Sequence, residues 1–422
     1  MSGGRPRAAV IGSGVAGLTA AHILQRRFDV TLFEADDRLG GHAHTHELVA
    51  ADAGAIDVDS GFIVHNRATY PNLIRLFEEL NVATRPTDMS MSVRCEGCGL
   101  EYAGARGFGG AFADPRAALR PAFLRMLVEI GRFHRHARRV LDSLDSGTTL
   151  GRFLEQGGYS AYFTSHFMVP VVSAVWSSAP GTALMYPARY LFTFLANHGM
   201  LSVKGSHQWY TVAGGSRTYV EAIAKGLHSV RLSTPVGSVR RLGDRSGVEV
   251  THPAGTEVFD RAVLAAHPQA SLRMLAEPTE LETRALGGFE YSPNRTLLHR
   301  DDRVLPRRGR ARASWNYLLP SCSATSEKVL VSYDMNRLQG LPTAERYVVT
   351  LNATDRVAAS RVVAAMDYEH PIYTPASVAA QGLLPRLNDG LVAFAGAYHG
   401  WGFHEDGCRS GVAAAASLGV DW

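Results

Sequence analysis

A glycine-rich segment near the N-terminus has the residue types and the spacing that bind a dinucleotide. Gly12 permits a tight turn after the apolar run 8–11, and Gly14 lets the backbone approach a pyrophosphate. Gly17 lets the following helix pack closely on that run, and the helix N-terminus offers free N–H groups to phosphates. The predicted phosphate-binding segment consists of Gly12, Ser13, Gly14, Val15, Ala16 and Gly17.

An acidic residue follows the second predicted strand, 29–33. The carboxylate of Glu34, with Ala35 beside it, can accept hydrogen bonds from the ribose hydroxyls of an adenosine. Strand, glycines, helix, strand and acidic residue therefore occur in the order of a dinucleotide-binding unit, which is stronger evidence than the glycines alone.

The residues after Glu34 narrow the choice of nucleotide. Arg38 brings a positive charge close to two phosphates. Gly40 and Gly41 supply backbone without side chains where a flavin ring would lie, and His42 follows them. We therefore predict non-covalent FAD, because Glu34 needs an adenosine half and the glycines suit a flavin beyond the pyrophosphate.

Two cysteines, Cys95 and Cys98, have the spacing of a zinc knuckle. No second CxxC or HxxxH pair accompanies them, and two ligands do not complete a tetrahedral site. We interpret the segment as a glycine-containing turn between two strands and expect no metal. Four cysteines in 422 residues fit a reducing cytoplasm rather than a disulfide framework.

The composition is that of an ordinary globular protein, with 46% hydrophobic and 19% charged residues. Its length favours two or three domains. A formal net charge of +4 is too small for a general nucleic-acid binder, so no nucleic acid is expected as a partner. No run of about 18 apolar residues is present, so we expect no transmembrane helix and a cytoplasmic location.

A long amphipathic helix is predicted within 114–144, beginning near Pro121. Its polar side is strongly basic over 120–139. Two interpretations stay open: a solvated face opposite a core stripe, or a helix that contacts an anionic membrane peripherally. The segment 157–195, rich in aromatic and small residues, is apolar enough for a buried substrate domain.

Longer strings extend the pattern along nearly the whole chain. They cover 33–42, 59–64, 70–73, 212–219, 314–317, 335–340, 367–371 and 402–407. Together they resemble the FAD-dependent oxidoreductases of the amine-oxidase and phytoene-desaturase superfamily. Within it they are most similar to a group of oxidoreductases encoded beside, or fused to, cyclopropane-fatty-acid synthases.

The resemblance implies an α/β fold with a Rossmann-like FAD-binding domain built from discontinuous segments, and an α+β substrate domain. The implied FAD-binding domain comprises 1–80, 206–270 and 386–422. The implied substrate domain comprises 81–205 and 271–385.

The resemblance also assigns further cofactor contacts. Val236 would meet the adenine through its backbone, and Phe403 would flank the flavin face, with plain core packing as its alternative. A backbone N–H of His404 or Glu405 would meet the flavin C2 carbonyl at a helix start. The implied contacts outside the glycine-rich segments are Gly61, Phe62, Val236, Ala265, Gly396, Phe403, His404 and Glu405.

Two positions depart from the family pattern. Ala397 follows Gly396, where many members carry a glutamate that holds the ribityl chain. The strand predicted at 294–299 contains no lysine, whereas amine oxidases place there a lysine that reaches the flavin through water. The three lysines of the chain are Lys204, Lys225 and Lys328.

We therefore expect hydride transfer between flavin N5 and a hydrophobic substrate, a lipid or an acyl chain. His198 and Tyr317 are candidate acid–base residues, and a neutral core histidine is the alternative for His198. A flavin amine oxidase that releases peroxide is a second hypothesis. A third is a flavoprotein without its own substrate, which serves a cyclopropane-synthase-like methyltransferase as a partner.

Overall fold

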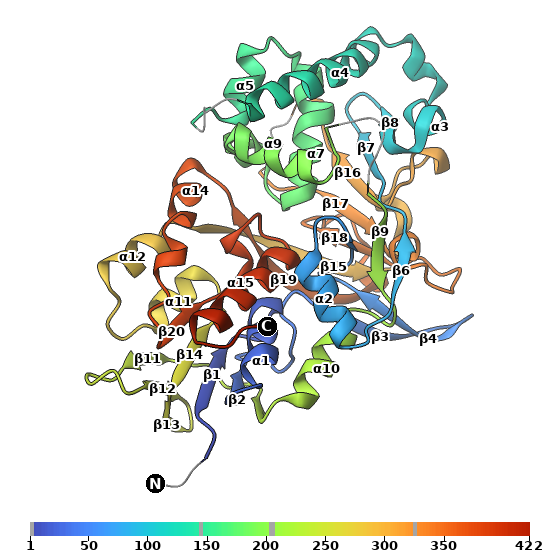
Figure 1. The fold of residues 1–422 in the computed structure, drawn as a ribbon. Coiled ribbons are helices and arrows are strands. Elements are labelled where there is room, and N and C mark those ends of the chain that lie inside the picture. Colours follow the sequence, from blue (N-terminus) through green and yellow to red (C-terminus); the bar gives the residue numbers. More distant parts are fainter. Residues whose placement is uncertain (1–3, 143–146, 202–206, 324–326) are drawn as a thin grey trace.

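A five-stranded parallel sheet joins segments from both ends of the chain (Figure 1). The structure is a computed structural model that describes residues 4–142, 147–201, 207–323 and 327–422. Residues Ala8, Ala9 and Val10 are all fully buried, as expected for a parallel strand covered on both faces. In spatial order the strands are β10 (Ser229–Arg231), β2 (Asp29–Phe33), β1 (Arg7–Ile11), β14 (Arg261–Leu264) and β20 (Val392–Phe394).

The first and last helices of the chain pack on each other beside this sheet. Helix α1 (Val15–Leu24) contacts α15 (His404–Ser417) and α10 (Arg217–Gly226), and α15 also contacts α2 (Pro71–Glu79). A Cβ at Gly407 would lie 2.6 Å from a methyl of Val15, and one at Gly411 would collide with the Ala16 carbonyl oxygen. The small residues of α15 therefore allow the close approach that fixes the C-terminal segment against the glycine-rich turn.

Further elements surround the parallel sheet. A three-stranded antiparallel sheet shares a core with β1 and β14, and the helices α11, α12 and α14 lie nearby. Residues 275–289 and 380–387 contribute to this same core. The packing therefore groups them with the parallel sheet rather than with the predicted substrate domain. The elements are β11 (Ser238–Arg241), β12 (Val248–His252), β13 (Gly255–Phe259), α11 (Pro268–Met274), α12 (Glu280–Leu286) and α14 (Pro375–Gln381).

A seven-stranded mixed sheet forms the centre of the second half of the molecule. Strands β7 and β16 run parallel with Leu319 opposite Cys95, and the other pairs are antiparallel. The predicted turn between two strands at Cys95–Cys98 is confirmed. In spatial order the strands are β19 (Val362–Ile372), β15 (Glu290–His299), β18 (Val348–Leu351), β17 (Val331–Asp334), β16 (Trp315–Leu319), β7 (Met91–Cys95) and β8 (Glu101–Tyr102).

A layer of helices lies at the far end of this sheet, at the top of Figure 1. The predicted basic helix is confirmed as α4, which begins at Pro121 and ends at Leu141. Among the described helices, none has the length and apolar composition needed to cross a membrane. The layer comprises α3 (Gly107–Ala111), α4 (Pro121–Leu141), α5 (Leu150–Gln156), α6 (Ala161–Phe163), a π-helical turn (Thr164–Met168), α7 (Val169–Trp176), α8 (Pro180–Met185) and α9 (Ala188–Asn197).

Two small sheets link the halves. One combines β5, β9 and β6, so its hydrogen bonds cross the domain boundary predicted at residue 80. The boundary predicted at 205–206 and Lys204 lie outside the described residues. The linking elements are β3 (Thr45–Ala50), β4 (Gly54–Asp59), β5 (His65–Asn66), β6 (Thr84–Thr87), β9 (Trp209–Val212) and α13 (Met335–Gln339).

The predicted fold class is confirmed: a Rossmann-like parallel sheet assembled from discontinuous segments accompanies a second α+β part. Strands of the parallel sheet come from 7–33, 229–264 and 392–394, and those of the seven-stranded sheet from 91–102 and 290–372. The exact domain boundaries stay a prediction.

Candidate functional site

The glycine-rich turn brings strand, helix and neighbouring strand into backbone contact. Gly12 has φ +102°, and a Cβ there would lie 2.7 Å from the carbonyl oxygen of Ala265. A Cβ at Gly17 would collide with the Gly12 carbonyl oxygen and lie 3.1 Å from the Ala265 methyl. Ala265 therefore contributes by letting the turn close against β14, as a small residue behind the glycines.

Gly14 differs from its neighbours because nothing lies within 4 Å of the position of its absent Cβ. It is the N-cap of α1, and no side chain caps that helix end. The N–H groups at Val15 and Ala16 belong to the first turn of α1, where backbone donors have no intrahelical acceptor. Gly41, with φ +57°, lies opposite, and a Cβ there would approach Gly14 Cα to 3.3 Å. Together these features form a backbone cradle suited to an anion.

A cavity of about 370 Å³ lies beside this cradle. Glu34, Ala35 and Val236 line it, as the sequence predicts, and Gly12 forms part of its wall. The Glu34 carboxylate accepts hydrogen bonds from the backbone N–H of Ser13 (2.8 Å), the Ser13 hydroxyl and the N–H of Asp36 (3.0 Å). Ser13 therefore holds Glu34 in place at the edge of the cavity.

Arg38 and His42 lie on either side of the Gly40-Gly41 pair and make different contacts. The Arg38 guanidinium donates to the Gly41 carbonyl oxygen over 2.8 Å, which fixes the glycine pair. His42 is stacked on Tyr368, with ring centroids 4.9 Å apart, and contacts His370 edge-on at 5.5 Å. Burial, reinforced by His370, holds the pKa of His42 well below its usual range. Sequence spacing does not indicate Tyr368 and His370 as neighbours of His42, although both lie within the string 367–371.

The loop after β4 meets the start of α15. A Cβ at Gly61 would collide with the His42 carbonyl oxygen, and Phe62 N–H donates to that oxygen over 2.7 Å. The Phe62 ring stacks on His404, with centroids 3.8 Å apart and planes 14° apart. Burial lowers the pKa of His404 to about 3, so this ring is neutral at physiological pH.

Two carboxylates near the start of α15 already accept hydrogen bonds from other parts of the protein. Glu405 accepts from the Asn72 side chain (2.6 Å) and from the backbone N–H of Leu73 (3.0 Å), so it caps α2. Asp406 accepts from the N–H groups of Trp401 (3.0 Å) and Phe403 (3.1 Å). Any contact of Glu405 with a flavin carbonyl therefore comes from its backbone N–H, as the resemblance implies.

Gly396 follows β20 (Val392–Phe394) and lies near α15. Its N–H donates to the Ser410 hydroxyl over 2.9 Å, and a Cβ there would overlap the Tyr398 ring. Ala397 follows directly, so the carboxylate expected from the family pattern is absent at this position. Gly396 ties the last strand to α15.

Phe403 lies in a cluster of aromatic rings at the junction of the two halves. Its ring stacks on Phe194 at 4.9 Å and approaches Trp176 and His198 at 6.1 and 6.3 Å. Because Phe403 is only half-buried, it combines core packing with an accessible face. His198 is in turn stacked between Phe194 (4.0 Å) and Trp209 (6.0 Å).

The two candidate acid–base residues differ in position. Both ring nitrogens of His198 face oxygen atoms, Nδ1 the Phe194 carbonyl at 3.0 Å and Nε2 the Thr69 hydroxyl at 3.3 Å. Burial lowers the pKa of His198 to about 4. Tyr317 lies in the core on β16, where burial raises its pKa to about 12. The structure does not place the two residues in one constellation, and their catalytic roles stay a prediction.

The residues present fit FAD on structural grounds. The cradle is open where Gly14 lacks a side chain, and the cavity beside Glu34 continues from it. Within the described part of the chain, His42 Nε2 and His404 Nε2 are buried without a hydrogen-bond partner at the opposite end. Such atoms favour a polar ligand that supplies the missing contacts. Glu34 would hold the ribose, the cradle the pyrophosphate, and His42, Phe62 and Phe403 the ring system.

Comparisons with known proteins support this assignment. Residues 15–418 match the family model described as flavin containing amine oxidoreductase. A tryptophan 2-monooxygenase from Allorhizobium ampelinum is 46% identical over 59 residues, which are 12% of this chain and 8% of that protein. The aligned part therefore spans only a small share of that relative's length.

Solved structures share the fold over nearly the whole chain. Cyclohexylamine oxidase from Brevibacterium oxydans is 16% identical with a TM-score of 0.68, over 98% of this chain and 99% of that one. A CLA-producing fatty acid isomerase from P. acnes is 13% identical with a TM-score of 0.66, over 96% and 97%.

The family match confirms the predicted flavin cofactor and the predicted class of FAD-dependent oxidoreductase. The backbone cradle and the cavity lined by Glu34 agree with a family match that spans nearly all of the chain. The chain belongs to the flavin-containing amine oxidoreductase family.

Proposed function

We propose that the protein transfers a hydride between flavin N5 and an uncharged, hydrophobic substrate of the lipid or acyl-chain class. The observation that carries the proposal is that the two carboxylates next to Phe403 in the sequence already have hydrogen-bond partners within the protein. Glu405 caps α2, and Asp406 binds two backbone N–H groups and the Arg409 guanidinium (2.8 Å). Neither is left to balance a substrate ammonium, whereas aromatic rings line the same region.

The strand that carries a lysine in amine oxidases supports the same substrate class. β15 (Glu290–His299) contains no lysine, and one of its buried polar residues is Asn294, which is 2% exposed. Asn294 binds His370 Nδ1 (3.0 Å) and accepts from Asn352 (2.6 Å). Burial lowers the pKa of His370 to about 4, so the pair is neutral. A neutral network at this position suits binding by apolar area rather than by charge.

In this proposal the bound flavin supplies the redox chemistry, and the protein supplies binding, orientation and a dry site. Phe403, Phe194 and Trp176 would hold an apolar chain against the ring. His198 and Tyr317 remain the candidate proton-transfer residues of the proposal.

Amine oxidation with release of peroxide is the second candidate function. The family name and the likeness to cyclohexylamine oxidase favour it, while the likeness to a fatty acid isomerase favours the lipid proposal. Both likenesses are at identities that bear on the fold alone. The choice therefore depends on the chemistry of the site.

A membrane contact would accompany a lipid substrate. Four large apolar side chains are exposed on or beside α3 and α4: Phe108, Leu119, Leu124 and Val128. Figure 1 shows these two helices at one end of the molecule. Phe108, Leu119 and Val128 are 87%, 84% and 74% exposed. α4 also carries several arginines. Positive charges beside exposed apolar side chains suit an anionic membrane surface. A cyclopropane-synthase-like methyltransferase is the corresponding proposed protein partner.

The deciding experiment reduces the flavin without oxygen. The FAD-loaded protein is mixed anaerobically with simple mono- and diamines, and separately with long-chain acyl lipids that carry a methyl or cyclopropane branch. We expect the flavin absorbance to bleach with an acyl lipid and to persist with the amines. Rapid bleaching by an amine, together with no response to any lipid, would establish the amine-oxidase function instead.

A flavoprotein without its own substrate gives a third pattern. No lipid and no amine would then bleach the flavin, and only addition of the methyltransferase partner would change its redox state. Phe108→Glu with Val128→Glu tests the membrane contact, because two charges on the exposed apolar side chains should abolish sedimentation with anionic vesicles. Val49→Glu is the control, because Val49 is 75% exposed but lies on β3 rather than on α3 or α4.

A further inference from the structure

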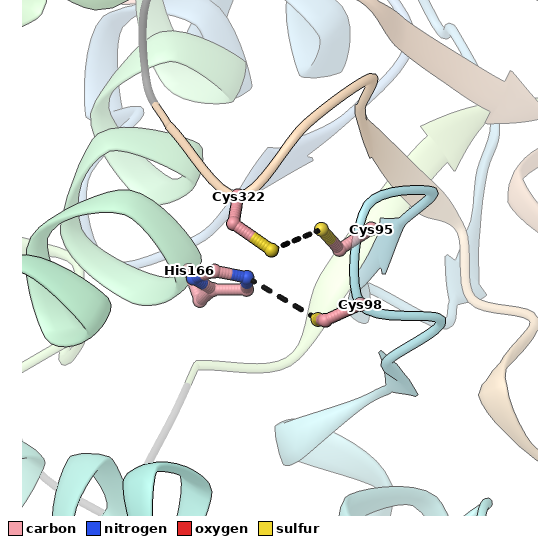
Figure 2. Close-up of side chains that lie close together, drawn as sticks. All are labelled: Cys95, Cys98, His166 and Cys322. Carbon is pink, nitrogen blue, oxygen red and sulfur yellow. Dashed lines mark hydrogen bonds between the residues drawn. The ribbon is translucent and has the colours of Figure 1, made fainter.

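Three cysteines and one histidine converge beside the turn between β7 and β8 (Figure 2). Cys95 ends β7, Cys98 closes the turn, Cys322 follows β16, and His166 lies in the π-helical turn Thr164–Met168. Their ligand atoms all lie within 4.8 Å of one another. The expectation that the CxxC pair lacks partners is therefore wrong, because the missing partners come from distant segments.

The spacing of these atoms is that of a tetrahedral metal site. Cys95 Sγ and Cys322 Sγ are 3.8 Å apart, and Cys98 Sγ and His166 Nε2 are 3.6 Å apart. Zinc bonds of about 2.3 Å to sulfur and about 2.0–2.1 Å to nitrogen place such atoms about 3.8 and 3.6 Å apart. A disulfide needs about 2.0 Å between sulfurs. We propose that Cys95, Cys98, His166 and Cys322 bind a structural Zn²⁺.

The backbone explains how the sulfurs meet. β7 and β16 pair in parallel, with Glu96 N–H donating to the Leu319 carbonyl oxygen over 2.8 Å. Both strands therefore end at one edge of the sheet, where their following loops lie together. A Cβ at Gly97 would lie 2.9 Å from the Cys322 nitrogen and 3.1 Å from its sulfur. Glycine at position 97 thus lets the Cys322 loop cross directly over the CxxC turn.

The histidine is held as a metal ligand usually is. His166 is fully buried, and its Nδ1 lies 2.8 Å from the Ser165 hydroxyl, which leaves Nε2 toward Cys98. The ring stacks on Tyr162 with centroids 3.9 Å apart, and Tyr102 OH donates to the His166 carbonyl oxygen over 2.7 Å. Partners behind a ligand fix its tautomer and orientation in this way.

Charge and access are also consistent with zinc. Three thiolates, one neutral imidazole and Zn²⁺ carry one net negative charge, and the Arg120 guanidinium binds the Cys98 carbonyl oxygen at 3.0 Å. Cys322 is exposed and borders a cavity of about 630 Å³ shared with Ser165 and Tyr159, which provides a path for the ion. Four protein ligands fill a zinc coordination sphere, so the ion has a structural role that ties β7 and β16 to the helical layer.

The proposal is tested on the FAD-loaded protein purified without chelator from cells grown with zinc. Elemental analysis should find about one zinc per chain, the content expected of a filled four-ligand site. Cys98→Ser and His166→Ala should each lower the zinc content at least about tenfold. Cys408→Ala is the matched control, because Cys408 lies on α15 outside the cluster, and it should keep its zinc. Gly97→Val, which leaves all four ligands intact, should also lose zinc.

Two measurements keep the test decisive if a variant does not fold. Cobalt-substituted wild type should show tetrahedral d–d bands at wavelengths beyond the flavin absorption, and crystals should show anomalous scattering at the zinc edge between the four side chains. Less than about 0.1 zinc per chain in the wild type would overturn the proposal, given the affinities usual for such sites. A Cys95–Cys322 disulfide in the native protein, or iron in place of zinc, would overturn it as well.

Discussion

The dinucleotide end and the aromatic end of the candidate site are built on opposite principles. At the first, Gly12 and Gly17 bring backbone against backbone, and Gly14 leaves space for a ligand. At the second, large rings such as Phe194 and Phe403 fill the space and define it by their volume. Adding atoms should therefore damage the first end, and removing atoms should damage the second. The two kinds of substitution separate binding of the cofactor from stability of the fold.

The largest effect is expected where a side chain would meet backbone. Gly17→Ala places a methyl on the Gly12 carbonyl oxygen, so α1 and β1 must separate. We expect a loss of at least about 5 kcal/mol in the free energy of unfolding, with loss of flavin. Gly131→Ala on α4 is the control, because its Cβ meets nothing and alanine favours a helix by about 0.5–1 kcal/mol. Equal stability of the Gly17→Ala variant and wild type in denaturant would contradict the geometry.

Removal of a ring at the aromatic end comes next. Phe194 is 3% exposed and stacks on both His198 and Phe403, so Phe194→Ala leaves a cavity. We expect the free energy of unfolding to fall by about 3–5 kcal/mol, measured by urea denaturation. Phe108→Ala, at a ring that is 87% exposed, should change it by less than about 0.5 kcal/mol. Similar losses for both variants would mean that the ring cluster does not carry the core.

A smaller effect, confined to the cofactor, is expected at Gly14. Its Cβ position is open, so Gly14→Val should fold normally while its side chain fills the cradle. We expect the dissociation constant of FAD to rise at least about 100-fold, which is about 2.7 kcal/mol. Titration of the FAD-free protein with FAD, alongside far-UV circular dichroism, measures both properties. Unchanged FAD affinity would show that the pyrophosphate binds elsewhere.

The sequence predicts the dinucleotide end because its determinants are local. The glycines, α1, β2 and Glu34 follow one another within one supersecondary unit, so spacing alone defines the geometry. The roles of Ser13 and Glu405 are less visible, since hydrogen bonds to Glu34 and to the start of α2 arise only when the chain folds. Spacing identifies which residues lie together, but not which of their atoms are already occupied.

The cysteine cluster shows the same limit more strongly. Its CxxC half is evident from spacing, whereas Cys322 arrives through the parallel pairing of β7 with β16 and His166 through the helical layer. Neither Cys322 nor His166 belongs to a local sequence motif that would identify it as a metal ligand. The roles of Gly97 and of the Ser165-His166 pair become evident only in the fold, where the Cys322 loop crosses the CxxC turn.

The last and smallest effect concerns His198, which lies within the aromatic cluster. Its pKa is about 4 in the folded protein against an ordinary value of 6.5, because burial disfavours the charged ring. The unfolded chain then binds more protons between these values, so this contribution to stability is present above pH 6.5 and is lost as pH falls toward 4.

In His198→Gln that pH-dependent loss of stability is absent. We therefore expect the stability gap between wild type and variant to be larger at pH 8 than at pH 5, as measured by urea denaturation at both values. Thr193→Val, at a half-buried site on α9, the helix that ends beside His198, should show no such change. A gap that is equal at the two pH values would mean that His198 is not held neutral, and would favour it as a group that exchanges protons during catalysis.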